Sequence, residues 1–115
     1  MTGEITLDLP LPPAVNVGRR IDWRATAKFS EWQSRTDMSV LAQGWRWKNG
    51  HAGPYELRLV MREGRHDLDA HEKAIVDYLV RIGVVASDSH HMLRSLHLEF
   101  GDAPDGCRAH IRRLP

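Results

Sequence analysis

The sequence has a single cysteine, Cys107, and no long run of apolar residues. One cysteine excludes an intrachain disulfide and any metal site built from several cysteines. No apolar run approaches the roughly 18–20 residues that a membrane-spanning helix needs. Residues 1–9 also lack the basic and apolar stretches of a signal peptide. We therefore expect a cytoplasmic protein that has no membrane partner.

The chain is too short for two ordinary domains. Its 115 residues are 42% hydrophobic and 27% charged, which is a folded and not a disordered composition. We expect one domain spanning residues 1–115. A chain of this length buries a modest core, so formation of a homodimer would add stability.

The formal net charge is only +1, but the charges are unevenly distributed along the chain. Residues 18–65 hold ten Lys or Arg against five Asp or Glu, whereas residues 66–105 hold three against eight. Thirteen of the sixteen basic residues are arginine, which contacts phosphate through two parallel hydrogen bonds. An acidic segment beside arginine-rich ones fits a metal-dependent enzyme that acts on a polyanion. An ordinary charged surface explains the same pattern, and charge alone does not decide between them.

Apolar residues alternate with polar ones in four segments and recur every three to four residues in two others. The expected strands cover residues 4–9, 55–62, 92–100 and 107–111, and the expected helices cover 24–42 and 70–82. Asp69 is the expected N-cap of the second helix, with Glu72 at the capping-box position, and Gly83 is its expected C-terminal cap. The order strand, helix, strand, helix, strand, strand predicts an α+β fold with a mixed four-stranded sheet packed by two helices.

Three aspartates form a candidate metal site. Asp67 and Asp69 are two residues apart where a strand gives way to a helix, so in extended chain both carboxylates face one way. The helix is ~20 Å long at 1.5 Å per residue, and the extended chain after Gly83 is long enough to bring Asp88 back along it. Oxygen ligands of this kind suit Mg²⁺.

Lys73 lies one helical turn after Asp69, close enough to contact a phosphate or the carboxylates. Each of these residues also has a purely structural explanation. The same sequence is explained without a metal if Asp69 is a helix cap, Lys73 is its i,i+4 ion-pair partner and Asp88 is a turn residue.

The segments Arg65-His66-Asp67-Leu68-Asp69, Lys73, Ile82-Gly83-Val84 and Ser87-Asp88-Ser89 resemble the RusA-type Holliday junction resolvases. In that family, Asp-Leu-Asp-Asn opens a lysine-containing helix, and a glycine and an Asp-Asp-x-Gln loop follow it. The first strand and its Leu9-Pro10-Leu11-Pro12-Pro13-Ala14-Val15-Asn16 continuation are similar to the family's Pro-Pro-Ser-x-Asn turn. Three separated motifs thus occur in the family's order over most of the chain.

The resemblance implies a Mg²⁺-dependent endodeoxyribonuclease, with Mn²⁺ as a substitute metal, that resolves four-way DNA junctions in recombination and repair. It implies a homodimer of bacterial or phage origin that is associated with the nucleoid while it acts. Asp67, Asp69 and Asp88 match the family's metal ligands, and Lys73 matches its active-site lysine. The residues expected to contact DNA are Asn16, Arg19, Arg20, Arg65 and Lys73.

The chain departs from the family pattern at three positions. Ala70 stands where the family usually has Asn, Ser87 replaces the first Asp of the Asp-Asp pair, and His90 stands where Gln is usual. These departures leave two alternatives open. One is a DNA-binding protein of the same fold with weak or no catalysis, and the other is a broader nuclease for branched DNA and flaps.

Other features admit two interpretations. His66, His71, His90 and His91 lie beside the acids, but zinc needs three or four converging ligands, so surface or outer-shell histidines are favoured. Trp45 and Trp47 alternate with cations, which is typical of nucleic-acid stacking surfaces and equally of core or dimer contacts. Arg108, Arg112 and Arg113 fit either phosphate binding or the solvated face of an edge strand.

Overall fold

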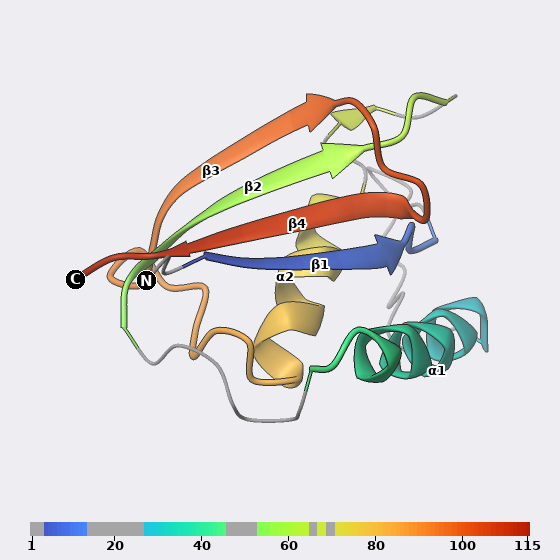
Figure 1. The fold of residues 1–115 in the computed structure, drawn as a ribbon, viewed down its shortest axis with the longest axis horizontal. Coiled ribbons are helices and arrows are strands. Elements are labelled where there is room, and N and C mark those ends of the chain that lie inside the picture. Colours follow the sequence, from blue (N-terminus) through green and yellow to red (C-terminus); the bar gives the residue numbers. More distant parts are fainter. Residues whose placement is uncertain (1–3, 14–26, 46–52, 65–66, 69–70) are drawn as a thin grey trace.

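The strands form one mixed sheet in the computed structural model, which describes residues 4–13, 27–45, 53–64, 67–68 and 71–115. The elements in chain order are β1 (Glu4–Pro10), α1 (Ala27–Ala42), β2 (Tyr55–Met61), α2 (Glu72–Arg81), β3 (Leu93–Phe100) and β4 (Gly106–Arg113). The expected α+β architecture of two helices and a four-stranded mixed sheet is confirmed (Figure 1).

The spatial order of the strands is β1-β4-β2-β3. β4 runs antiparallel to both of its neighbours, β1 and β2, whereas β2 and β3 are parallel and are connected through α2. β1 and β3 are therefore the two edges of the sheet, and β4 is an interior strand. The edge-strand explanation of Arg108, Arg112 and Arg113 is wrong, because the pairing order depends on contacts between distant segments that local periodicity does not report.

One face of the sheet carries the core, and both helices cover that face (Figure 1). Buried residues alternate along the strands, as the period of two predicts. Leu7 and Leu9 of β1 lie beside Cys107 and Ala109 of β4 on this face. The buried residues of β2 on the same face are Tyr55, Leu57, Leu59 and Met61. The opposite face is polar and open.

α1 buries the residues that the helical spacing predicts, namely Phe29, Trp32, Thr36 and Val40. The Trp32 ring lies between Phe29 and Tyr78 of α2, with ring centroids 5.3 and 5.2 Å away. These aromatic contacts join the two helices beneath the sheet. Neither helix of the described residues is long and apolar enough to cross a membrane.

The start of α2 corrects one expectation. The helix begins at Glu72 with His71 at the N-cap position, so Asp69 is not the cap. His71 is only 5% exposed, and this buried side chain anchors the start of the helix below the sheet. The surface interpretation of His71 is therefore wrong, and its outer-shell interpretation stays a prediction. The C-terminal end agrees with the sequence prediction, because Gly83 has φ +76° and its N–H donates to Val80 C=O.

Candidate functional site

α2 presents a lysine and an aspartate on its outer surface. Its opposite side is fixed in the core by buried residues that include Ile75, Tyr78 and Leu79. Lys73 and Asp77 lie one turn apart, and residues at this spacing are neighbours on a helix surface. The Lys73 Nζ lies 3.0 Å from Asp77 Oδ1. Asp77 was not among the residues predicted for the site, although its i+4 position relative to Lys73 is a readable signal.

The chain after α2 turns back and brings Asp88 to the same lysine. Val84 and Val85, both buried, hold the returning chain against the core just after the Gly83 turn. Asp88 Oδ2 then accepts a hydrogen bond of 3.1 Å from Lys73 Nζ. The chain therefore returns along the helix as far as Lys73, which is 15 residues from Asp88 in sequence. The expected convergence of Asp88 with Asp67 and Asp69 stays a prediction.

A buried tyrosine holds the loop that carries Asp88. The Tyr55 hydroxyl at the start of β2 donates a hydrogen bond of 2.8 Å to the Ser87 carbonyl. The Ser87 hydroxyl in turn accepts a hydrogen bond of 3.0 Å from the Ser89 N–H, which closes a local turn. Burial raises the pKa of Tyr55 to about 12, and the charge of Asp88 adds to the shift. Tyr55 is therefore a neutral donor at physiological pH.

The carboxylates of Asp77 and Asp88 stabilise the positive charge of Lys73. The hydrogen bonds that Lys73 donates to Asp77 and to Asp88 raise its pKa above the ordinary value, although burial acts in the opposite direction. The ammonium is therefore fully charged at neutral pH and lies between two carboxylates. With one cation and two carboxylates, the group keeps one negative charge in excess when all three are ionised.

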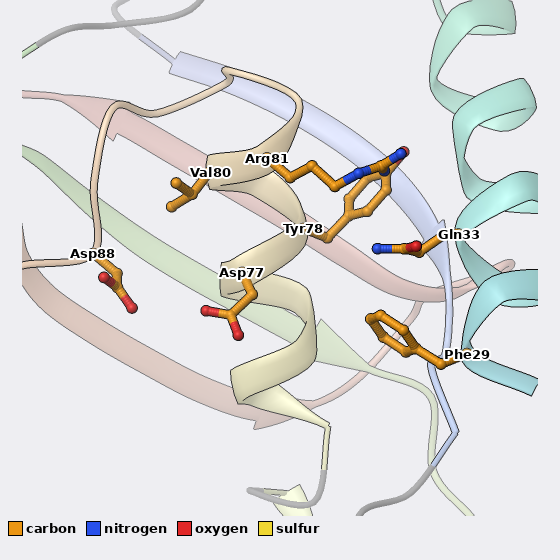
Figure 2. Close-up of a pocket in the computed structure, with 7 residues that line it drawn as sticks. All are labelled: Phe29, Gln33, Asp77, Tyr78, Val80, Arg81 and Asp88. Atoms are coloured by element: carbon orange, nitrogen blue, oxygen red, sulfur yellow. The ribbon is translucent and has the colours of Figure 1, made fainter. Parts of the chain in front are cut away.

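An open pocket of about 420 Å³ lies beside these residues and between α1 and α2. Figure 2 shows Asp77 and Asp88 on one side of α2, with Phe29 and Gln33 of α1 on the other side. The residues that line the pocket are Phe29, Gln33, Asp77, Tyr78, Val80, Arg81 and Asp88. The pocket thus combines apolar walls with carboxylates at one end.

Asp37 fixes the distance between the helices that form the pocket. Its Oδ1 accepts a hydrogen bond of 2.6 Å from the Tyr78 hydroxyl and one of 3.3 Å from Arg81. The Arg81 guanidinium also lies 5.8 Å from the centre of the Tyr78 ring, which is a cation–π distance. Burial and the neighbouring Asp37 raise the pKa of Tyr78, so this link between α1 and α2 stays protonated.

Only part of the predicted site lies within the described residues. Lys73 and Asp88 are brought together, and Asp67 is exposed in the short segment before α2. Asp69 lies outside the described residues, as do four residues expected to contact DNA: Asn16, Arg19, Arg20 and Arg65. His90 and His91 are exposed, and their rings lie 3.9 Å apart.

Mg²⁺ in proteins is bound mainly by oxygen ligands, carboxylates among them. Among the described residues, no three His, Cys, Asp or Glu side chains lie close enough to hold a metal ion. Asp69 lies outside those residues. The carboxylate oxygens of Asp67 and Asp88 are the donor type that Mg²⁺ prefers. In addition, Lys73 Nζ already lies between Asp77 and Asp88, which shows that this position attracts a cation.

Two of the arginines for which phosphate binding was one interpretation are paired with acids on the open face of the sheet. Arg108 Nε lies 2.7 Å from Asp8 Oδ1 on β1, and Arg112 pairs with Glu56 on β2. The hydrogen bonds that Arg108 donates to Asp8 raise the pKa of Arg108 above its ordinary value. These cross-strand pairs stabilise the sheet and leave less positive charge on this face for DNA.

Trp45 is also explained by the fold. It packs against the core, and its Nε1 donates a hydrogen bond of 3.4 Å to the Ile82 carbonyl at the end of α2. The core interpretation is therefore confirmed for Trp45, whereas Trp47 lies outside the described residues.

No protein-family model and no curated protein matches this chain. The function is therefore inferred from the residues themselves and from their geometry.

Proposed function

We propose that this chain is a Mg²⁺-dependent endonuclease that cuts four-way DNA junctions during recombination and repair. The observation that carries the proposal is the contact between Lys73 and Asp88, two residues that the resemblance to RusA-type resolvases assigns to one active site. A helix, a glycine turn and a returning loop are needed to produce this contact. The loop that carries Asp88 is also fixed by the hydrogen bond from Tyr55 to Ser87. An ion pair without a function would not require such a fixed loop.

Asp67, Asp69 and Asp88 would hold the Mg²⁺, or Mn²⁺ as a substitute. The bound metal supplies an acidified water and stabilises negative charge on the scissile phosphate. Asp77 keeps the ammonium of Lys73 charged and close to Asp88. From that position Lys73 can exchange its contact with Asp88 for one with a phosphate oxygen. Tyr55 and Ser87 keep the Asp88 loop in one conformation, so the carboxylate is positioned before DNA binds.

The resemblance assigns contacts with the DNA backbone to residues other than the arginines of β4. Because Arg108 and Arg112 are engaged with acids, we assign DNA binding to Asn16, Arg19, Arg20, Arg65 and Lys73. A homodimer supplies two such sites, and resolution of a junction of near-twofold symmetry requires two cuts. We place this activity in the cytoplasm of a bacterium or of a phage-infected cell.

The proposal is tested with a labelled immobile four-way junction and a matched linear duplex, each with and without Mg²⁺. We expect paired cuts in the junction only, and only when Mg²⁺ is present. The Asp69→Asn and Asp88→Asn variants should lose cutting and retain junction binding, because each removes a metal ligand and lowers repulsion of the phosphates. Asp105→Asn, in the exposed turn before β4, is the matched control and should cut normally.

Other outcomes identify the two alternatives. Junction binding without cutting, at any Mg²⁺ or Mn²⁺ concentration, indicates a DNA-binding protein of the same fold. Equal cutting of flaps and junctions indicates a broader nuclease for branched DNA. Joint loss of binding and of cooperative thermal unfolding in Asp88→Asn would show that Asp88 is structural.

A further inference from the structure

The pocket between α1 and α2 starts at the candidate metal ligand Asp88 and extends to α1. Asp77 and Asp88 line one end, and Phe29 and Gln33 line the other (Figure 2). Residues of α2 form the floor between the two ends. The volume of about 420 Å³ lies within the range of small-molecule sites, about 300–1,000 Å³. A pocket of this size suits one small planar group and not a DNA duplex.

The apolar walls of this pocket are fixed by the core. Phe29 and Tyr78 are buried, and both rings pack against Trp32, with centroid distances of 5.3 and 5.2 Å. The Tyr78 hydroxyl is also bonded to Asp37, so the two helices keep their separation. The pocket is therefore formed before a ligand enters, and an apolar planar ligand can bind without reorganising the protein.

The charged groups that line the pocket are engaged within the protein. Asp77 and Asp88 lie 3.0 and 3.1 Å from Lys73 Nζ. Arg81 donates a hydrogen bond to Asp37. A cationic ligand would have to displace Lys73 from both carboxylates, and an anionic ligand would be repelled by them. These charges favour an electrically neutral group in the pocket.

Gln33 offers the pocket a polar group that the fold does not use. Its amide makes no hydrogen bond within the described part of the chain, and Figure 2 shows it turned toward α2. Gln43, the other glutamine of the chain, has both amide atoms bonded to the backbone of Asp8 at 2.7 Å. A carboxamide presents N–H donors beside a C=O acceptor. Nucleobases present the same combination along their edges and are read in pockets through such contacts.

We propose that this pocket holds one unpaired base of the DNA strand, from the nucleotide next to the scissile phosphate. The base lies between the apolar walls, and the Gln33 amide hydrogen-bonds its edge. The phosphate stays at the opposite end, beside Lys73 and Asp88. This placement rests on the proposed nuclease function, because it requires the scissile phosphate to lie beside Asp88.

An unpaired base gives the protein a physical means of distinguishing a branch point from a linear duplex. A base within a duplex must unpair and unstack before it can enter the pocket, and the cost is smallest for a base that is already unpaired. Bases at the crossover of a four-way junction unpair more easily than bases inside a duplex. The pocket therefore favours cutting at branch points.

Nuclear magnetic resonance tests base binding without metal and without cutting. Because the chain has two glutamines, selective ¹⁵N labelling of their side chains resolves the amides of Gln33 and Gln43. Each of the four deoxynucleoside monophosphates is titrated in the absence of Mg²⁺. We expect a saturable shift of the Gln33 amide and no shift of the Gln43 amide. Deoxyribose phosphate, which lacks a base, should shift neither.

Two results of the titration would overturn the proposal. One is a Gln33 amide that no nucleotide shifts. The other is an equal shift with deoxyribose phosphate or with spermidine, because the pocket would then bind an anion or a cation instead of a base.

Junctions that lack one base provide the second measurement. Immobile four-way junctions are prepared with an abasic nucleotide on one or the other side of the cut. We expect one of the two positions to slow cutting at least tenfold. Gln33→Ala should slow cutting of the intact junction and make cutting much less sensitive to the missing base. Ser34→Ala, at the exposed next residue of α1, is the matched control and should respond like the unmodified protein.

The two measurements separate failure of the pocket from failure of the nuclease. Nucleotide binding at Gln33 without cutting of any junction would contradict the proposed function and leave the base-binding pocket in place. Equal cutting of intact and abasic junctions would overturn the pocket and leave the nuclease in place.

Discussion

The Tyr55 hydroxyl donates a hydrogen bond of 2.8 Å to the carbonyl of Ser87, 32 residues further along the chain. This single bond connects the first residue of β2 to the loop that presents Asp88. The Tyr55 side chain is buried in the core, whereas Ser87 is half-buried, so the bond joins the core to the surface loop. The position of Asp88 therefore depends on the core of the sheet as well as on its own turn.

Replacing Tyr55 by phenylalanine removes this bond and leaves the ring in the core. We expect Tyr55→Phe to lower the free energy of unfolding by about 1–2 kcal/mol, because the Ser87 carbonyl loses a buried donor. We also expect slower junction cutting, since the Asp88 loop is less fixed. Urea denaturation and initial cutting rates provide the two measurements.

Tyr78→Phe is the matched control for that variant. It removes the hydrogen bond to Asp37, which connects α1 to α2, and leaves the Asp88 loop unchanged. A similar loss of stability with a much smaller loss of cutting is expected. If both variants slow cutting equally, Tyr55 acts only through overall stability.

The two tyrosines of the chain predict how stability changes at high pH. Burial raises the pKa of Tyr55 from 10.0 to about 12, and it also raises the pKa of Tyr78. The folded protein therefore keeps phenolic protons that the unfolded chain releases. The stability that the Tyr55 phenol contributes is fully present below pH 10 and is lost as the pH rises through about 12.

Ultraviolet absorbance at high pH checks this expectation. Tyrosinate absorbance should remain low in the folded protein at pH 10 and should increase sharply when urea unfolds it at the same pH. Ionisation of both tyrosines near pH 10 without unfolding would contradict the buried positions of their hydroxyls.

Lys73 has opposing effects on metal binding and on catalysis. We expect Lys73→Met to reduce cutting by about 10²-fold, the usual loss when one charge-stabilising group is removed. Binding of Mg²⁺ should stay equal or become tighter, because the cation that now lies beside Asp88 is gone. Calorimetric titration with Mg²⁺ measures the second effect. Lys28→Met, at an exposed lysine of α1, is the control and should change neither.

Salt dependence separates the DNA-binding arginines from the structural ones. Each phosphate contact contributes about −0.9 to the slope of log affinity against log salt concentration for duplex DNA. We expect Arg19→Gln and Arg20→Gln each to reduce that slope by about 1. Arg112→Gln should leave it unchanged, because Arg112 is paired with Glu56. A flat salt dependence in the unmodified protein would remove nucleic acid from its partners.

Local patterns were enough to predict most of the secondary structure. The alternation of Leu57, Leu59 and Met61 predicted β2. The spacing of Trp32, Thr36 and Val40 predicted α1. Each pattern is sufficient because it reports which side of one segment faces the core. The capping pattern at Asp69 was misleading, since helix starts also depend on what packs around them. Here the buried His71 takes the N-cap position.

Apart from Asp77, which lies one helical turn after Lys73, the features of the site that were missed depend on contacts between distant segments. Sequence spacing indicated that Asp88 could reach Lys73, but it did not show that Tyr55 holds the loop. A tyrosine among the aliphatic residues of β2 was the available signal, because a buried hydroxyl needs an acceptor. The interior position of β4, and with it the pairing of Arg108 with Asp8, required the strand order itself.

The pairing of β1 with β4 has a consequence for how the protein forms during synthesis. Glu4 lies opposite Arg112, so the two strands join nearly opposite ends of the described chain. β1 leaves the ribosome long before its partner and cannot enter the sheet until β4 has emerged. Contacts of such long sequence separation slow folding, because a large loop must close before they form. Gln43 emerges much earlier than β4. Its side-chain amide is positioned to occupy the backbone groups of Asp8 on β1 until β4 is synthesised.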